Sequence, residues 1–168
     1  MLNSGSDSLA AVAPDANFAA PWSYSLTMTE LQGDTTAPTN TFGLMFAYQQ
    51  IGSIYHFYSV EITNTESGSG YALFKYDSSN QNSPWQMIWQ GKTSTELHLG
   101  LNVANTVKVT AQANSLTITV NSQSVGTIPN IILTSGQFGM LVILKGSEVA
   151  FQDMPVSYTH LRAHETGR

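Results

Sequence analysis

The sequence predicts an all-β protein built as a two-layer antiparallel β-sandwich, and three observations lead to that prediction. Apolar and polar residues alternate with a period of two in several segments, as in strands that bury one face. Short clusters of Gly, Asn, Asp and Ser, which favour tight turns, separate these segments. No segment of the sequence carries sustained helical periodicity. Strands of this kind, joined by turns, bury their apolar faces between two sheets.

The alternating segments follow one another along most of the chain. In the first, residues 22–29, the apolar Tyr24, Leu26 and Met28 alternate with Ser and Thr. We expect the alternate apolar residues of the later segments to form the core with them. These segments are TFGLMFAYQQ (41–50), FYSVEIT (57–63), GYALFKY (70–76), NTVKVTA (105–111), SLTITVN (115–121) and FGMLVIL (138–144).

Domain organisation follows from changes in composition. Residues 1–21 mix small residues with Pro14 and Pro21, which predicts a linker or an irregular segment. Residues 22–155 have the length of one domain with a two-layer core. Residues 156–168 differ from the rest, because they hold both arginines of the chain and half of its histidines.

This tail has two interpretations. His160, His164 and Glu165 would share one face of a helix, as zinc ligands do at this spacing. However, VSYTHLRAHET (156–166) resembles one reading frame of a transposase adaptor used to prepare sequencing libraries, and the tail has no apolar stripe to bury. We therefore interpret residues 156–168 as a non-native tail without function, and expect the native C-terminus to lie elsewhere.

Composition excludes some classes of function. The net charge is −5, so nucleic acid is not an expected partner, since phosphate binding depends on clustered Lys and Arg. Charged residues make up only 10% of the chain while Ser, Thr, Asn and Gln are abundant, which favours an exported, surface-displayed module. There is no cysteine and no apolar stretch long enough to cross a membrane. We expect an export signal or anchor outside this sequence and fusion to other domains.

Five motifs, in order, resemble those of concanavalin A-like (laminin-G-like) jelly-roll domains, including the bacterial 3-keto-disaccharide hydrolase-like group. The resemblance as a whole covers about residues 22–156. The motifs are FGLMF (42–46), FYSVEI (57–62), GYALFK (70–75), NTVKVTAQANSLTITVNSQSVGTI (105–128) and SGQFGMLVILKGSEVAFQDMPV (135–156).

The resemblance implies a jelly-roll fold that hosts lectins, glucanases, sulfated-glycan binders and spacers, so it implies no single function. The sequence also departs from the family at two places. Members of the family often carry Arg after the FGLMF-like strand and another basic residue on the FYSVEI-like strand, where this chain has Ala47 and Glu61. An anion or sugar contact inherited at those two positions is therefore in doubt.

Aromatic residues are the best candidates for ligand binding. In a regular strand, Trp85 and Trp89 share a face with Met87 between them, and two exposed indoles could stack on sugar rings. Glu61, Phe57 and Tyr55 should point away from the core on their strand, together with Ser59 and Thr63, on a face that can line a ligand site. The alternative for the two tryptophans is burial in the core.

Catalytic residues are not expected. Glucanases of this fold place carboxylates at alternate positions of one strand, whereas this chain has Glu30, Gln32 and Asp34, of which Gln32 cannot ionise. We expect Glu30 and Asp34 to be solvated acids at a strand end. His56 should lie on the core side as a structural histidine.

No metal or organic cofactor is expected. Calcium remains an alternative, with ligands from Asp77, Asn80 and Asn82, although a loop rich in Asp and Asn is also typical of turns.

The sequence thus leads to one main hypothesis and two alternatives. The main hypothesis is a non-catalytic module of a larger exported bacterial protein, at the cell surface or outside the cell, that binds carbohydrate or a cell-surface polymer through Glu61, Trp85, Trp89, Phe57 and Tyr55. The first alternative is a glycoside-hydrolase-like enzyme domain acting on a sugar derivative. The second is a spacer or protein-interaction domain without glycan affinity.

Overall fold

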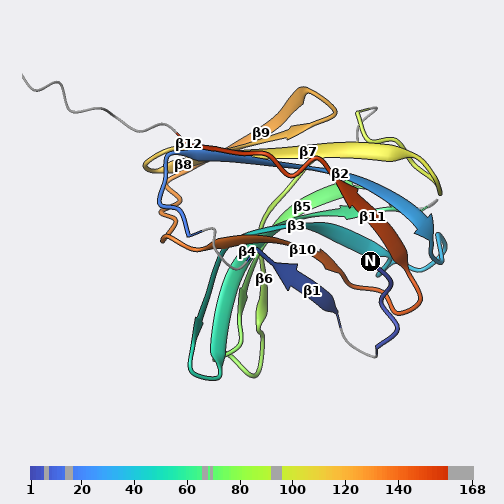
Figure 1. The fold of residues 1–168 in the computed structure, drawn as a ribbon, viewed down its shortest axis with the longest axis horizontal. Helices are drawn as coiled ribbons and strands as arrows, with labels where there is room; N and C mark the ends of the chain where they lie inside the picture. Colours follow the sequence, from blue (N-terminus) through green and yellow to red (C-terminus); the bar gives the residue numbers. More distant parts are fainter. Residues whose placement is uncertain (6–7, 14–16, 66–67, 69, 92–95, 159–168) are drawn as a thin grey trace, which may run out of the picture.

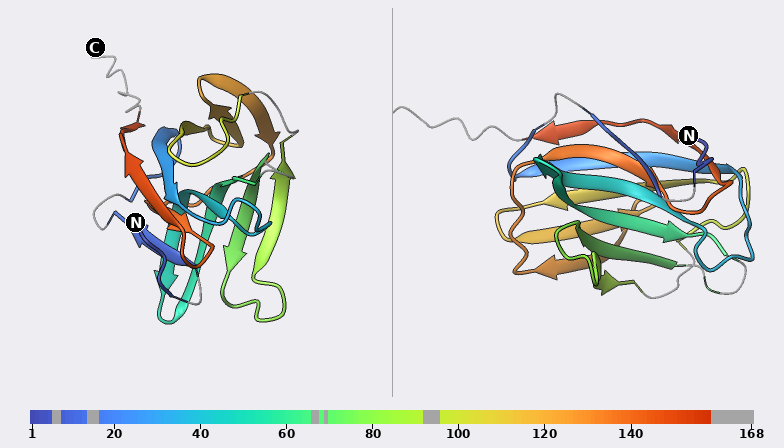
Figure 2. Two further views of the ribbon diagram at one scale, coloured as in Figure 1. Left: turned by 90° about the vertical axis from the view of Figure 1, so that its right-hand side faces the viewer. Right: turned by 90° about the horizontal axis from the view of Figure 1, so that it is seen from below.

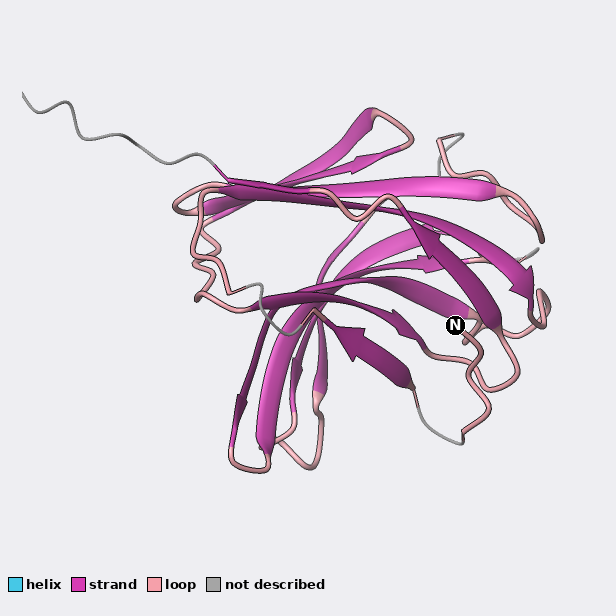
Figure 3. Ribbon diagram, in the orientation of Figure 1, coloured by secondary structure: helices cyan, strands magenta, loops and turns pink. Residues whose placement is uncertain are grey.

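The protein is a sandwich of two antiparallel sheets, with no helix among the residues described (Figures 1 and 3). The computed structural model describes residues 1–5, 8–13, 17–65, 68, 70–91 and 96–158. The predicted all-β, two-layer antiparallel sandwich is confirmed. A search of the described residues finds no helix long and apolar enough to span a membrane.

One sheet, which we call the front sheet, carries the candidate site. Its strands, in spatial order, are β1 (Leu9–Val12), β10 (Gln137–Val142), β3 (Thr41–Ile51), β4 (Ile54–Thr63), β5 (Gly70–Asp77) and β6 (Trp85–Gln90).

The other sheet, the back sheet, covers the inner face of the front sheet (Figure 2). Two short strands pair with different parts of β2, so the back sheet also has six strands. Its strands are β11 (Glu148–Gln152), β2 (Trp22–Gln32), β7 (Ala104–Ala111), β8 (Ser115–Val120) and β9 (Gln123–Pro129), with β12 (Val156–Tyr158) as the second neighbour of β2.

The core lies between the sheets and contains the alternate apolar residues that the period of two predicts. Tyr24, Leu26 and Met28 of β2 are completely buried. The other large core residues come from both sheets and include Phe42, Leu44, Phe46, Val60, Ile62, Val107, Val109, Leu116, Ile118 and Val120. At roughly 25 cal/mol per Å² of apolar surface, this burial is the main force that holds the sheets together.

Part of the N-terminal segment belongs to the front sheet. Within residues 1–21, interpreted from the sequence as a linker or irregular segment, residues 9–12 form β1 and pair with β10. Phe18 packs its ring 5.6 Å from that of Phe138. All four residues of β1 (LAAV) are apolar, so the sequence shows no alternation there.

The described part of the C-terminal tail also joins the fold. Val156–Tyr158, the first three residues assigned to the tail, pair with β2 as β12. Residues 159–168, including His160, His164 and Glu165, lie outside the described residues.

Candidate functional site

The outer face of the front sheet forms a curved surface, because the sheet bends until its two edge strands approach each other. The two edge strands of the front sheet are β1 and β6. Ala10 of β1 and Trp85 of β6 line the same hollow, although four strands lie between them in the sheet. The hairpins β3–β4 and β5–β6 extend beyond the sandwich at one end (Figure 1). The curvature makes this face concave, which is the shape of ligand sites.

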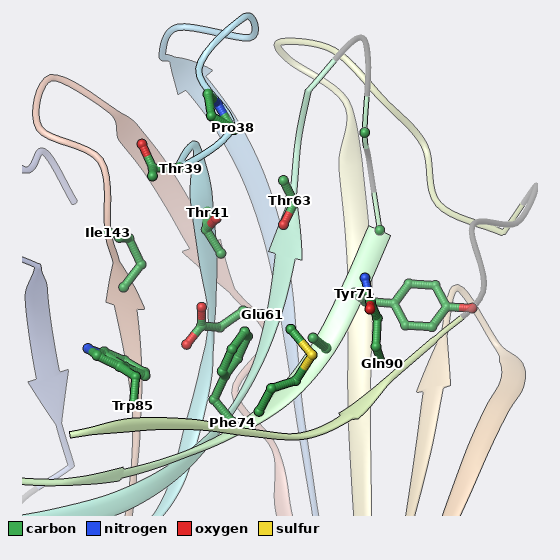
Figure 4. Close-up of a pocket in the computed structure, with 14 residues that line it drawn as sticks. Pro38, Thr39, Thr41, Glu61, Thr63, Tyr71, Phe74, Trp85, Gln90 and Ile143 are labelled. Carbon is green, nitrogen blue, oxygen red and sulfur yellow. The ribbon is translucent and has the colours of Figure 1, made fainter. Parts of the chain in front are cut away.

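Two adjoining hollows occupy this face. The first, which we call the Glu61 groove, has a volume of about 320 Å³ (Figure 4). The second, the aromatic hollow, has a volume of about 360 Å³ and shares Trp85 with the first. The side chains facing the Glu61 groove include Thr39, Thr41, Glu61, Thr63, Phe74, Trp85, Met87, Gln90 and Ile143, and those of the aromatic hollow include Tyr55, Phe57, Tyr76, Trp85 and Leu141.

Glu61 lies on the floor of the groove and is only 5% exposed. Its carboxylate points among Thr41, Ile143 and Trp85 (Figure 4). The hydroxyl of Ser59 donates a hydrogen bond of 2.6 Å to Oε1. Burial raises the pKa of Glu61 to about 7, and the bond from Ser59 offsets part of that rise. Neither hollow is lined by a described Lys, Arg or His.

Small residues leave room above Glu61. Gly43 of β3 pairs with Glu61 of β4, and a Cβ at Gly43 would lie 2.2 Å from the carbonyl oxygen of Val60. Ala72 of β5 pairs with Glu61 on its other side. The two cross-strand neighbours of Glu61 are therefore a glycine and an alanine, so the groove reaches down to the sheet.

An aromatic ladder continues from the groove toward the tip of the hairpins. The rings of Phe57 and Tyr76 stack with centroids 5.0 Å apart and planes 10° apart, and those of Tyr55 and Tyr76 stack at 5.5 Å and 15°. Trp85 packs edge-on against Tyr76 at 4.8 Å, and Tyr48 lies 6.4 Å from Tyr55. The outward orientation expected for Phe57 and Tyr55 is confirmed, although Phe57 itself is buried among these rings.

The expectation that Trp85 and Trp89 share a face is wrong, because β6 contains a β-bulge. Leu73 pairs with Trp89 but the next residue, Phe74, pairs with Met87, so Ile88 is an extra residue. The extra residue shifts the alternation, so Trp85 and Met87 face outward while Trp89 packs against the main core. Core packing, the alternative considered for both tryptophans, therefore describes Trp89.

Trp89 closes the core at the edges of the two sheets. Its ring stacks on Tyr71 at 6.0 Å. It also reaches across to the back sheet, where a Cβ at Gly126 of β9 would lie 2.4 Å from its Cζ2. Trp89 thus packs where β6 of one sheet lies near β9 of the other.

Glu30 and Asp34 are not a carboxylate pair. Glu30 is only 1% exposed, which corrects the expectation of a solvated acid, whereas Asp34 is exposed and accepts hydrogen bonds from Thr36. The amides of Asn40 and Asn64 donate to Oε2 of Glu30, while Oε1 is buried without a hydrogen-bond partner. Burial raises the pKa of Glu30, and the two amides oppose that rise.

The remaining candidates form local structural contacts. Oδ1 of Asp77 accepts hydrogen bonds from the backbone and hydroxyl of Ser79, and Oδ1 of Asn80 accepts one from the backbone of Ser83. These bonds stabilise the β5–β6 turn. Nε2 of His56 lies 2.9 Å from Oε1 of Gln49. The described residues contain no group of three or more His, Cys, Asp or Glu side chains placed to hold a metal ion.

Two residues at the site were not among the sequence-based candidates. Thr41 and Phe74 line the groove because their strands follow the same alternation as Glu61. The alternation within β3 and β5 was the signal that could have identified these residues as outward-facing. What the sequence lacks is the pairing that sets Gly43, Glu61 and Ala72 side by side.

The chain has the fold of several carbohydrate-binding proteins. No protein-family model matches it, and no curated protein matches it by sequence. Among solved structures it is similar to the carbohydrate-binding module CBM66 from Bacillus subtilis, with a TM-score of 0.68 and 17% identity over 90% of this chain and 83% of that chain.

Galectins are similar in structure as well. A toad ovary galectin, solved in complex with thio-digalactose, has a TM-score of 0.58 and 13% identity over 91% of this chain and 100% of its own. A tetrameric galectin from the ball sponge Cinachyrella has a TM-score of 0.57 and 11% identity, over 91% of this chain and 99% of its own. At these identities the similarity concerns the fold. The chain therefore shares the jelly-roll β-sandwich fold of these proteins, which is the fold that the resemblance in its sequence implies.

Proposed function

We propose that the chain is a non-catalytic carbohydrate-binding module whose ligand lies across the Glu61 groove and the aromatic hollow. The observation that carries this proposal is the continuity of the two hollows, because Trp85 lines both. A chain of sugar rings could follow this path, with apolar ring faces on aromatic side chains and hydroxyl groups against polar ones. Two proteins with this fold support the same class of ligand, since CBM66 is a carbohydrate-binding module and the toad ovary galectin is in complex with thio-digalactose.

The polar residues of the groove suit hydroxyl-rich ligands. Thr41 and Thr63 carry hydroxyl groups, and Gln90 carries an amide, each able to donate and accept hydrogen bonds. Glu61 is the one carboxylate among the described lining residues of either hollow. Hydrolysis of a glycosidic bond by the usual mechanisms needs two carboxylates across the bond, so binding accounts for this arrangement better than catalysis.

The proposal extends to context. An exported protein that carries this module would use it to hold a larger polypeptide, and any catalytic domain fused to it, on a glycan or a cell-surface polymer. The proposed location is extracellular or at the cell surface. Both the low content of charged residues and a glycan ligand favour that location.

Affinity electrophoresis tests the proposal. The wild-type protein would migrate through native gels that each contain one soluble polysaccharide from a varied panel, and we expect retardation in at least one gel. Trp85→Ala should abolish the retardation, because it removes the ring shared by both hollows. Ile132→Ala, at a side chain 77% exposed and outside both hollows, is the control and should leave the retardation in place.

Uniform mobility of the folded wild-type protein across the panel would contradict the proposal. It would favour a spacer or protein-interaction domain. Retardation that persists in the Trp85→Ala variant would place the binding surface outside the two hollows.

A further inference from the structure

The described lining of the Glu61 groove contains one charged group, the carboxylate of Glu61. The carboxylate on the floor faces no basic side chain among the described lining residues. Lys75 lies on β5 with the opposite parity to Phe74, which faces the groove. The whole chain has a net charge of −5, so the long-range field also favours cations over anions at this surface.

The walls around Glu61 are apolar and aromatic. Phe74 and Trp85 contribute rings, and Ile143 adds apolar surface (Figure 4). Met87 also lines the groove. Apart from the hydroxyl of Ser59, no described side chain donates a hydrogen bond to the carboxylate. Closing a neutral ligand over Glu61 would remove the remaining water from the ionised carboxylate without supplying an opposite charge, so the carboxyl would have to take up a proton.

An ammonium group would resolve this imbalance. It would donate a charge-assisted hydrogen bond to the carboxylate and balance its charge in the same contact. Aromatic rings such as Trp85 and Phe74 also attract ammonium groups through their negatively polarised faces. A carboxylate beside aromatic rings, with no cation of its own, is thus a set of groups suited to recognise a cation.

From these groups we infer that the groove binds a glycan containing free amino groups, such as a β-1,4-linked glucosamine chain, with one ammonium group paired to Glu61. The inference rests on the proposed function and names its ligand class. The aromatic hollow, which holds no charged residue among its described lining, would take the neighbouring sugar rings. Anionic glycans, such as sulfated or uronic-acid polymers, would be repelled by Glu61.

Calorimetric titration with a pair of matched oligosaccharides tests the inference. The probes are a glucosamine hexasaccharide and its fully N-acetylated counterpart, titrated into the wild-type protein near neutral pH and low salt. We expect the free-amine oligosaccharide to bind about tenfold more tightly or better, the difference that a charge-assisted hydrogen bond makes. Equal affinity, or tighter binding of the acetylated form, would overturn the inference.

Two variants separate recognition by Glu61 from general attraction to an acidic protein. Glu61→Gln keeps the shape of the side chain and removes its charge, so the ratio of the two affinities should fall to about one. Asp153→Asn removes an exposed charge in the loop between β11 and β12, and the ratio should remain as in the wild type. An equal loss of the ratio in both variants would show that net charge alone causes it, and would overturn the inference.

Two further measurements show which of the two hypotheses, the glycan class or the proposed function, is wrong. The first is a competition with choline, which carries a cation but no sugar. If choline displaces the glucosamine hexasaccharide at equal concentration, the assignment of a glycan ligand is overturned. If neither hexasaccharide binds while neutral polysaccharides still retard the protein in native gels, the inference fails and the proposed function stands. If no polysaccharide of any charge binds, the proposed function fails too.

Discussion

Glu61 connects the site to the stability of the fold. Its folded-state pKa of about 7 exceeds the ordinary value of 4.5 because the carboxyl is buried on the outer face of a sheet, with Ser59 as its donor. Between these two pH values the folded protein retains a proton that the unfolded chain has released. Protonation of Glu61 therefore favours the folded state, and this contribution declines as the pH rises.

The first prediction concerns this pH dependence. The free energy of unfolding should fall between about pH 4.5 and about pH 7, with Glu61 contributing up to about 3 kcal/mol. Glu61→Gln cannot ionise, so its slope should be shallower than that of the wild type. Urea denaturation across this pH range measures both slopes. Parallel slopes would mean that Glu61 has an ordinary pKa in the folded protein.

Glu30 shows how a single residue can differ from what its neighbours in sequence suggest. Its position near the end of β2 predicts solvent contact, but Asn40 and Asn64 come from other parts of the chain and cover it. Their side-chain amides point at its carboxylate, and the backbone of Asn102 donates to its carbonyl oxygen at 2.7 Å. Contacts of this kind depend on tertiary structure, which local sequence does not encode.

The second prediction follows from this cluster. Glu30→Ala should destabilise the protein by about 2–4 kcal/mol, because it leaves two buried amides each short of an acceptor. Asp34→Ala, at an exposed position two residues beyond β2, should cost less than about 1 kcal/mol. Chemical denaturation of the two variants gives the comparison. Equal and small effects would contradict a buried role for Glu30.

At the scale of elements, one extra residue decides which tryptophan faces the ligand surface. The period of two correctly assigns the core faces of β2, β4, β7 and β8, and of β3 as far as Phe46. Beyond Phe46 a register shift in β3 places Tyr48 on the outer face, beside Tyr55. The period of two fails in β6, because alternation within one strand does not reveal the bulge at Ile88. That bulge is defined by the pairing of β6 with β5. Half of the aromatic pair predicted for the site is therefore part of the core.

The third prediction separates the two tryptophans. Trp89→Ala should destabilise the protein by about 3 kcal/mol, because it opens a cavity at the edge of the core beside Tyr71 and Gly126. Trp85→Ala should cost less than half as much, since its ring lies on the outer surface of the front sheet. Thermal unfolding followed by circular dichroism measures both. A larger loss for Trp85→Ala would contradict the assignment of faces.

The fourth prediction concerns the close approach of β3 and β4 beneath the groove. Gly43→Ala should cost about 2 kcal/mol or more, because its Cβ would lie 2.2 Å from the carbonyl oxygen of Val60 and the backbone would have to shift. Gly70→Ala is the matched control, since a Cβ there meets nothing within 4 Å. Denaturation midpoints that fall equally in both variants would contradict a steric role for Gly43.

At the scale of the whole molecule, the site depends on curvature that no sequence segment specifies. The fold class, its antiparallel strands and the outward position of Glu61 could be predicted, because alternation and turn residues are local signals. The meeting of β1 and β6 around one hollow could not, since it results from the twist of the complete sheet. The aromatic ladder likewise needs the register between β4 and β5, which sets Phe57 beside Tyr76.

The chain contains three tryptophans, and their indole groups report on three different places. Trp22 is buried in the core, Trp89 closes its edge, and Trp85 faces both hollows. The most direct test of the account is therefore an NMR titration of the three indole N–H signals with a glycan that retards the protein in native gels. The account predicts a saturable shift of the Trp85 signal with little change at Trp22 and Trp89. A bound glycan that leaves the Trp85 signal in place, or shifts that of Trp89 instead, would contradict it.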